Sequence, residues 1–195
     1  MDQDNNMKMV LYHGSRLEVP HPSLTYSRSD VDFGTGFYMT KDEHMAKKWA
    51  CNKSVSVVNA YELDLTHLRI YYFKPDEEWL NYCIANRYME QPDFEENKYD
   101  VLVGPTADDK LFNTLDMYAD GLLSTDEAIK VITCMNYSEQ IVIKNQASID
   151  ENLHFQSSHT LHGSEKQHFI ELFKQDRMEA NKRSEMLIKA IKRGR

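Results

Sequence analysis

Two short segments near the N-terminus carry residue types that could do chemistry. Residues 12–15 (YHGS) place His13 at the end of a short apolar run, and the following Gly14 lets a ligand approach the backbone closely. Residues 33–40 (FGTGFYMT) come about twenty residues later and join a glycine-rich turn to a tyrosine. Each segment alone is also typical of an ordinary loop, so neither is specific without the other.

The sequence excludes two common nucleotide-binding motifs. A dinucleotide fingerprint needs a third glycine in GxGxxG, and Met39 occupies that position. The phosphate-binding pattern GxxxxGK[ST] does not occur anywhere in the chain. The sequence therefore predicts neither a Rossmann domain nor a P-loop domain.

Taken together, the segments resemble the ADP-ribosyltransferase superfamily, in the His-Tyr-Glu branch of diphtheria-type toxins and poly(ADP-ribose) polymerases. The chain looks most like a bacterial family of small uncharacterised proteins in that superfamily. That family carries YHGS, SRxxxDFGxGFYxT, a WA dipeptide and DVxxGPxADD, which correspond to residues 12–15, 27–40, 49–50 and 100–109. The resemblance covers about residues 8–155.

The resemblance implies an α+β fold, the split β-sandwich of ADP-ribosyltransferases, with NAD bound as co-substrate in a cleft between the sheets. It implies that His13 bonds a ribose hydroxyl, that Gly14 and Ser15 contact NAD through the turn, and that Tyr38 offers a face to the nicotinamide ring. Trp49, eleven residues after Tyr38, corresponds to a second stacking residue. Core packing of an amphipathic helix is the alternative interpretation of Trp49.

The chemistry of such a site is the cleavage of the bond between nicotinamide and ribose. Its transition state resembles an oxocarbenium ion, as in glycoside hydrolysis, and nicotinamide leaves as a neutral ring. The site must therefore position the ribose and favour positive charge, and it needs no strong general acid.

The third residue of the family site is usually a glutamate just before a short apolar strand. Here the apolar run is IVI, residues 141–143, and it is preceded by Glu139 and Gln140. Neighbours on a strand point to opposite faces, so one of the two can enter the site, and register favours Gln140. A glutamine can hydrogen-bond a ribose hydroxyl but cannot act as a base, which favours the transfer of a single ADP-ribose unit.

Arg28 is a candidate for the pyrophosphate of NAD, because a guanidinium matches phosphate oxygens bidentately. The alternative is an ion pair with Asp30 or Asp32. Asp108 and Asp109 are typical of a helix N-terminus, where carboxylates complement the helix dipole.

Composition limits the class of protein. The chain has 195 residues, of which 41% are hydrophobic and 28% are charged. No apolar run approaches the roughly 20 residues of a membrane helix, and the N-terminus lacks a secretory pattern. Three distant cysteines favour a reducing cytoplasm. His154, His159 and His162 lie in a polar stretch without a ligand pattern, so no metal site is predicted.

Charge is distributed unevenly along the chain. Residues 165–195 hold nine basic and five acidic residues, a net of +4, while the remainder holds 14 basic and 26 acidic residues, a net of −12. An acidic body argues against broad affinity for nucleic acid, and the basic end leaves a local contact open.

The elements that must position these residues follow from periodicity and turn signals. Residues 40–43 (TKDE) fit a capping box for the next helix. Residues 1–155 should form the ADP-ribosyltransferase-like domain, and residues 156–195 a linker and a basic, partly docked helix over 165–192. A polar loop is expected over 13–32 and loop or linker over 145–164. Strands are expected over 8–12, 37–40, 54–65, 68–73, 99–103 and 141–143. The first helix should run from the capping box at 40–43 to about residue 52, and further helices are expected over 76–89, 108–119 and 125–135.

The leading functional hypothesis is a cytoplasmic mono-ADP-ribosyltransferase that modifies a macromolecule, either protein or nucleic acid. The resemblance suggests a bacterial toxin or defence effector controlled by a partner such as an antitoxin, with no membrane association. An NAD-dependent RNA 2′-phosphotransferase is a rival on the same fold, but it needs several cations in the cleft. A non-catalytic NAD-binding module is the other rival, favoured by Gln140.

Overall fold

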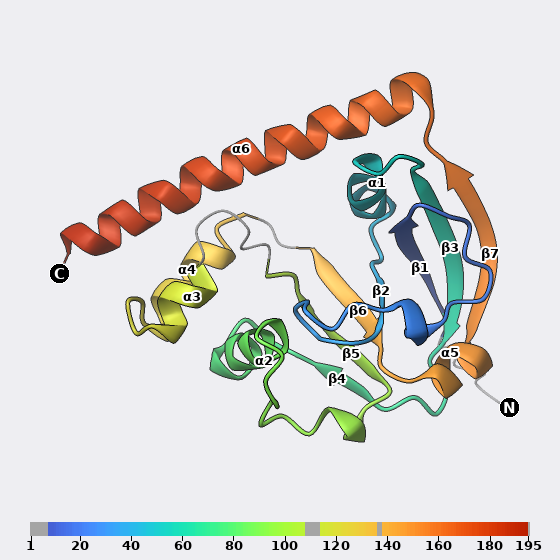
Figure 1. The fold of residues 1–195 in the computed structure, drawn as a ribbon, viewed down its shortest axis with the longest axis horizontal. Coiled ribbons are helices and arrows are strands. Elements are labelled where there is room, and N and C mark those ends of the chain that lie inside the picture. Colours follow the sequence, from blue (N-terminus) through green and yellow to red (C-terminus); the bar gives the residue numbers. More distant parts are fainter. Residues whose placement is uncertain (1–7, 108–113, 136–137, 195) are drawn as a thin grey trace, which may run out of the picture.

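The computed structural model describes residues 8–107, 114–135 and 138–194. Over these residues the chain is α+β, with two sheets and six α-helices (Figure 1). Asp108, Asp109 and the first part of the helix predicted over 108–119 lie outside the described residues. None of the described helices is long and apolar enough to cross a membrane.

A three-stranded antiparallel sheet has the order β1-β3-β7, in which β1 is Lys8–Ser15, β3 is Val57–Asp64 and β7 is Leu153–Thr160. A four-stranded sheet has the order β2-β6-β5-β4, and it consists of β2 (Phe37–Met39), β6 (Glu139–Ile143), β5 (Val101–Pro105) and β4 (Ile70–Tyr72). The pair β4 and β5 is parallel, and the other pairs of this sheet are antiparallel.

The two sheets meet where β1 passes β2. Tyr12 and Thr40 exchange backbone hydrogen bonds, with N–O distances of 2.8 and 3.0 Å. This bridge brings the YHGS segment beside the FYM strand, although the two are about twenty-five residues apart in the chain. The junction lies on the side of the molecule that the C-terminal helix crosses (Figure 1).

Alternating side chains divide the four-stranded sheet into two apolar faces. The inner face packs against the three-stranded sheet through residues such as Phe37, Met39, Ile141 and Ile143. The outer face, with Leu102 and Val142, packs in one apolar cluster with α2 (Glu77–Arg87), and α3 (Thr114–Ala119) and α4 (Thr125–Ile132) pack against α2. Apolar side chains fill the space between the sheets, so a ligand can reach this sandwich only at its edge.

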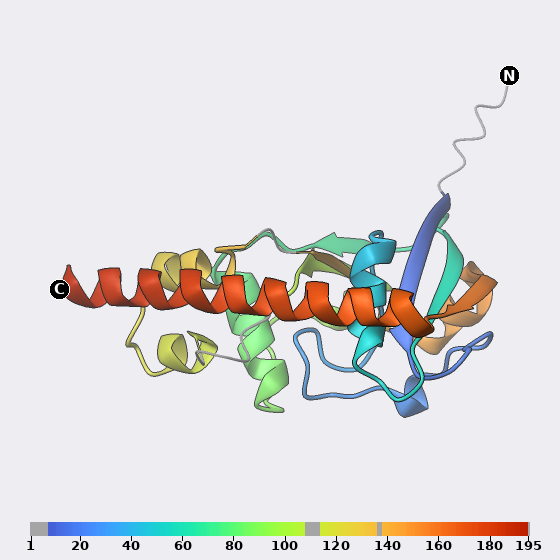
Figure 2. The same cartoon turned by 90° about the horizontal axis from the view of Figure 1, so that it is seen from above.

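The remaining helices flank the sheets. The first, α1 (Glu43–Cys51), packs on β1 and β3, and the short α5 (Gln146–Asn152) follows β6. The last, α6 (Gly163–Arg193), runs across the molecule from α1 to α4 (Figure 1 and Figure 2). Its buried residues are Phe169, Ser184 and Ile188, which confirms a long helix that is only partly docked. Two 3-10 helices, Leu24–Tyr26 and Glu96–Lys98, lie in the loops.

The prediction of loop and linker over 145–164 is wrong. That stretch forms α5 and β7, and a domain boundary at residue 155 falls inside β7. Little apolar alternation marks this strand in the sequence, because β7 is an edge strand with mostly exposed polar side chains.

Two local boundaries also differ from expectation. The strand β1 continues to Ser15, so residues 13–15 are strand rather than loop, because they pair with β3 up to Val57. The first helix is capped by Asp42, whose side chain accepts from the His44 N–H, and not by Thr40. Thr40 cannot serve as the cap because its backbone is committed to the bridge with Tyr12.

Candidate functional site

His13 lies at the junction of the sheets with its ring in a defined orientation. Its Nδ1 is 2.7 Å from the Tyr38 carbonyl oxygen, and its ring packs against Phe37 with centroids 4.5 Å apart and planes tilted by 33°. A carbonyl can only accept, so Nδ1 carries the proton and Nε2 has an open lone pair. Burial, reinforced by the Lys53 charge, lowers the pKa of His13 although the carbonyl contact opposes this. The ring is therefore a neutral hydrogen-bond acceptor near pH 7.

The Nε2 atom of His13 is accessible and has no partner among the described residues. In that part of the chain, Asn181 Oδ1 is the one fully buried side-chain polar atom without a partner, so Nε2 of His13 keeps contact with solvent. An oriented acceptor of this kind suits a hydroxyl donor such as that of a ribose.

Tyr38 belongs to the same strand region but its side chain points to the outer face. Its hydroxyl donates to the Gly34 carbonyl at 2.7 Å and accepts from the Phe33 N–H at 3.0 Å. Burial and, secondarily, the nearby Asp32 carboxylate raise the pKa of Tyr38, so the phenol is neutral. The structure thus joins His13 to Tyr38 through a main-chain carbonyl and does not bring the two rings together.

Gln140 is buried, with 3% of its surface exposed. Its Nε2 donates to Pro105 O at 3.0 Å and to Asp32 Oδ2 at 3.2 Å. These contacts place the side chain on the outer face of β6, together with Val142 and away from His13.

Glu139 occupies the opposite position. Successive strand residues alternate, so its side chain shares the inner face with Ile141, and it is exposed beside Lys41 at an N–O distance of 3.4 Å. His13, packed against Phe37, lies on this same face. Register reasoning from the sequence favoured Gln140 as the inward residue; Gln140 is indeed the buried one, but Glu139 is the carboxylate on the face of His13.

Gly14 is required for packing rather than only for ligand approach. A Cβ atom at Gly14 would lie 2.3 Å from Ala46 O and 3.0 Å from Ala50 N, both in the backbone of α1. Trp49 belongs to α1, is half-buried, and has its Cβ 3.2 Å from the position that a Cβ at Gly14 would take. Ser15 is the last residue of β1, and its Oγ accepts from the Leu17 N–H at 3.1 Å and from Asn59 Nδ2 at 3.2 Å.

Arg28 forms an ion pair with Asp30. Its Nε and Nη2 donate to both carboxylate oxygens of Asp30 at 3.0 and 3.1 Å, on an exposed loop. Exposed pairs of this kind contribute little to stability, so a phosphate could compete for the guanidinium. Two surface hollows, of about 430 and about 100 Å³, lie beside α2 and beside Lys144, and neither is lined by His13, Glu139 or Arg28.

Sequence reasoning missed two residues on the outer side of this region, Asp32 and Arg87. Asp32 carries a signal in the sequence, since it opens the DFG segment, but local spacing indicates it only as a partner for Arg28. Its partner is Arg87, which donates to Asp32 Oδ1 from Nε at 2.9 Å. Arg87 lies in a helix 55 residues away, and no local pattern links the two.

A model of the family described as "Protein of unknown function (DUF3990)" matches residues 9–155, about three quarters of the chain. The chain belongs to this family. The DUF3990 match includes β1 through α5 and ends within β7, and every site residue described above lies inside it. The long helix α6 lies beyond it. No curated protein and no solved structure matches the chain.

Proposed function

We propose that this DUF3990 protein is a mono-ADP-ribosyltransferase that moves ADP-ribose from NAD to a macromolecule. The observation that carries the proposal is the oriented, neutral imidazole of His13, whose accessible Nε2 acceptor lies on the same face as the Glu139 carboxylate. The α+β arrangement supports it, because the bridge between Tyr12 and Thr40 that joins the two sheets is next to His13, and so does the resemblance in the YHGS and DFGxGFYxT segments.

The proposed reaction breaks the bond between C1′ of the ribose and the nicotinamide nitrogen. The bonding pair leaves with nicotinamide, which departs neutral, and positive charge develops on the ribose. In this proposal His13 Nε2 holds a ribose hydroxyl, and the half-buried Trp49 stacks on the nicotinamide. Tyr38 holds β2 against the FGTG loop through its hydroxyl and orients His13 through its carbonyl. The acceptor atom then bonds to C1′ and loses a proton.

Glu139 is the group that supports the developing charge in this proposal. It is exposed, and among the described residues it is paired with Lys41. Such a pair separates at small cost, so the carboxylate can turn to a ribose hydroxyl or to the acceptor proton. Gln140 then has a structural role on the outer face of β6, where its amide binds Asp32 and Pro105.

The RNA 2′-phosphotransferase alternative needs several cations in the cleft to hold an RNA phosphate. Lys41 is paired with Glu139 and Arg28 with Asp30, so each of these exposed pairs must open before its cation can bind a phosphate. The non-catalytic alternative predicts that NAD binds without releasing nicotinamide.

The test uses NAD labelled in the adenylate group, incubated with the purified protein and a cell lysate. The proposal expects label in macromolecules, and removal by nuclease or by protease identifies the acceptor class. One ADP-ribose mass increment per site is expected. Glu139→Gln should abolish transfer, whereas Gln140→Ala should lower it less; the reverse order would mean that the charge-supporting role was given to the wrong face of β6. Binding of NAD without free nicotinamide would establish the non-catalytic alternative.

A further inference from the structure

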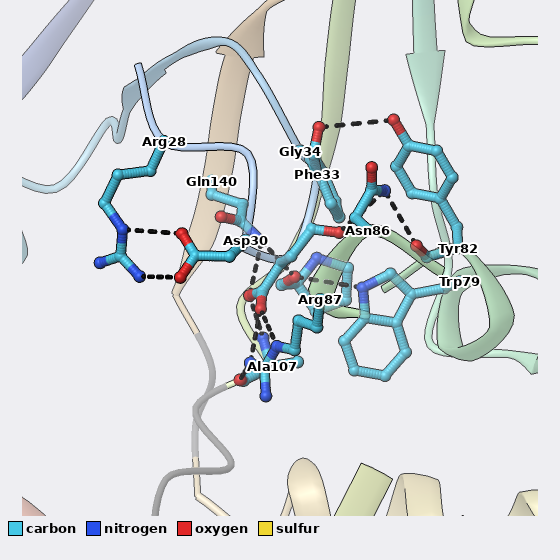
Figure 3. Close-up of polar contacts among 12 residues, drawn as sticks. Arg28, Asp30, Phe33, Gly34, Trp79, Tyr82, Asn86, Arg87, Ala107 and Gln140 are labelled. Atoms are coloured by element: carbon cyan, nitrogen blue, oxygen red, sulfur yellow. Dashed lines mark hydrogen bonds and ion pairs between the residues drawn. The ribbon is translucent and has the colours of Figure 1, made fainter. Parts of the chain in front are cut away.

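A single carboxylate gathers donors from three separate elements on the outer face of the four-stranded sheet. Asp32 Oδ1 accepts from Arg87 Nε at 2.9 Å and from Nη2 at 2.5 Å, and Arg87 belongs to α2. Asp32 Oδ2 accepts from the Ala107 N–H at 2.8 Å, just after β5, and from Gln140 Nε2 at 3.2 Å, in β6. In Figure 3 the three residues that donate to this carboxylate, Arg87, Ala107 and Gln140, lie around it.

The loop that carries this carboxylate also carries the anchors of Tyr38. The residue after Asp32 donates its N–H to the Tyr38 hydroxyl, and that hydroxyl donates to the Gly34 carbonyl. Gly34 adopts φ 62°, and a Cβ there would lie 2.3 Å from Asn86 Oδ1, so this backbone fits closely against α2. Any shift of Asp32 is therefore passed on to Tyr38 within two residues.

Gln140 connects Asp32 to β6, the strand that carries Glu139. It is the chain neighbour of Glu139, and its amide is held between Asp32 and Pro105. The Asp32 carboxylate thus holds β6 through Gln140, next to Glu139. The loop that carries Asp32 also holds the Tyr38 hydroxyl in β2. The Tyr38 carbonyl in turn orients the His13 ring.

We propose that Asp32 is a positioning residue for the NAD site: it clamps β6 and the FGTG loop together, and so sets the separation of Glu139 from His13. This rests on the proposed function. It also accounts for the amide at position 140. Both atoms that Gln140 Nε2 meets, Asp32 Oδ2 and Pro105 O, are acceptors, so a glutamate there would face two acceptors without a donor.

The chain offers a matched control at the other end of β5. Asp100 accepts from Arg69 Nε at 2.9 Å and Nη2 at 2.8 Å, from the Arg69 N–H at 2.9 Å and from Asn145 Nδ2 at 3.0 Å. It therefore has the same set of donors as Asp32: a guanidinium fork, a backbone N–H and a side-chain amide. It differs in lying at the end of β5 opposite to Pro105 and Gln140.

The experiment compares Asp32→Asn with Asp100→Asn in the full chain, below the unfolding temperature of both. Nicotinamide release is expected to lose about tenfold or more in kcat in Asp32→Asn, since small displacements of reacting groups are costly, with KM for NAD changed less than threefold. Asp100→Asn should keep the unchanged protein's kcat. Equal kcat values for the two variants would overturn the proposal, because a merely structural carboxylate would act alike in both places.

A second measurement does not depend on turnover. Hydrogen exchange of the Phe33 and Ala107 amides, followed by NMR, should speed up at least tenfold in Asp32→Asn and stay unchanged in Asp100→Asn. Unchanged exchange in Asp32→Asn would overturn the clamp even if activity falls. If the unaltered protein releases no nicotinamide, the proposed function fails, whereas the exchange rates still decide whether Asp32 holds the loop.

Discussion

Gln140→Glu is a one-atom change whose cost follows from the contacts of Gln140. The amide nitrogen lies 3.2 Å from Asp32 Oδ2 and 3.0 Å from Pro105 O. A carboxylate in its place would set two negative charges about 3 Å apart. At an effective dielectric constant of about 20, their repulsion is about 5 kcal/mol.

Protonation of the introduced carboxyl group limits this cost. Holding its proton at pH 7 costs about 1.4 kcal/mol for each pH unit above its ordinary pKa of about 4.3, or about 4 kcal/mol. At pH 5 the same cost is only about 1 kcal/mol. The Asp32 charge raises the folded-state pKa of the introduced carboxyl group above its unfolded value, so the variant is most stable at low pH and loses stability as pH rises.

The assay is urea unfolding of the unchanged protein and of Gln140→Glu at pH 5 and at pH 7, together with Asp32→Asn and the double variant. The groups that face position 140 from neighbouring elements are Asp32, Arg87 and Tyr38. The penalty of Gln140→Glu should be about 3 kcal/mol larger at pH 7 than at pH 5, and smaller in the Asp32→Asn background. Glu139→Gln, which breaks only an exposed pair with Lys41, should change stability by less than about 0.5 kcal/mol.

Two results would refute this reasoning. A Gln140→Glu protein as stable as the unchanged one at pH 7 would mean that Asp32 does not face residue 140. A penalty that does not fall in the Asp32→Asn background would mean that the repulsion comes from another group.

Three further predictions concern the frame around the site. Gly14→Ala should lower the free energy of unfolding by about 1–3 kcal/mol, because its Cβ meets the α1 backbone at 2.3 Å, while Gly194→Ala, with nearest atoms at 3.7 Å, should be neutral in thermal unfolding. Ser184→Cys should form a disulfide with Cys134, whose Sγ lies 3.3 Å from Ser184 Oγ, and should gain about 2–4 kcal/mol on oxidation; four titratable thiols after oxidation would contradict this. Hydrogen bonding to Arg69 lowers the pKa of Asp100 to about 2, so its stabilisation is present above pH 4 and lost as pH falls toward 2; Asp100→Asn should lack this acid-dependent loss in pH-dependent unfolding.

Local sequence signals were sufficient to predict many of the strands and helices, and they singled out the segments that contain His13 and Tyr38. Strong apolar runs predicted β1, β2 and the core of β6, and the long helix α6 followed from composition and periodicity. The resemblance carried by the YHGS and FGTGFYMT segments assigned His13 and Tyr38 to one NAD site, which stays a prediction; in the structure a 2.7 Å contact joins His13 Nδ1 to the Tyr38 backbone carbonyl rather than to its ring.

The remainder depends on contacts between distant residues, which have no local pattern. Asp32 and Arg87 meet across 55 residues, and β7 is recognisable only through its pairing with β3. The facing of Glu139 and Gln140 could not be read from burial preference alone. A polar residue can be buried on the outer face when two acceptors bind it, as Pro105 and Asp32 bind Gln140.

Nicotinamide release from NAD tests the central claim most directly. The purified protein is incubated with NAD and free nicotinamide is measured by chromatography, beside His13→Ala and a His13→Gln variant that keeps a hydrogen-bonding side chain without the oriented imidazole. The account predicts release by the unchanged protein and a loss of at least a hundredfold in both variants, with their unfolding temperatures still well above the assay temperature. Wild-type rates in both folded variants would contradict the assignment of His13 as the group that holds the ribose.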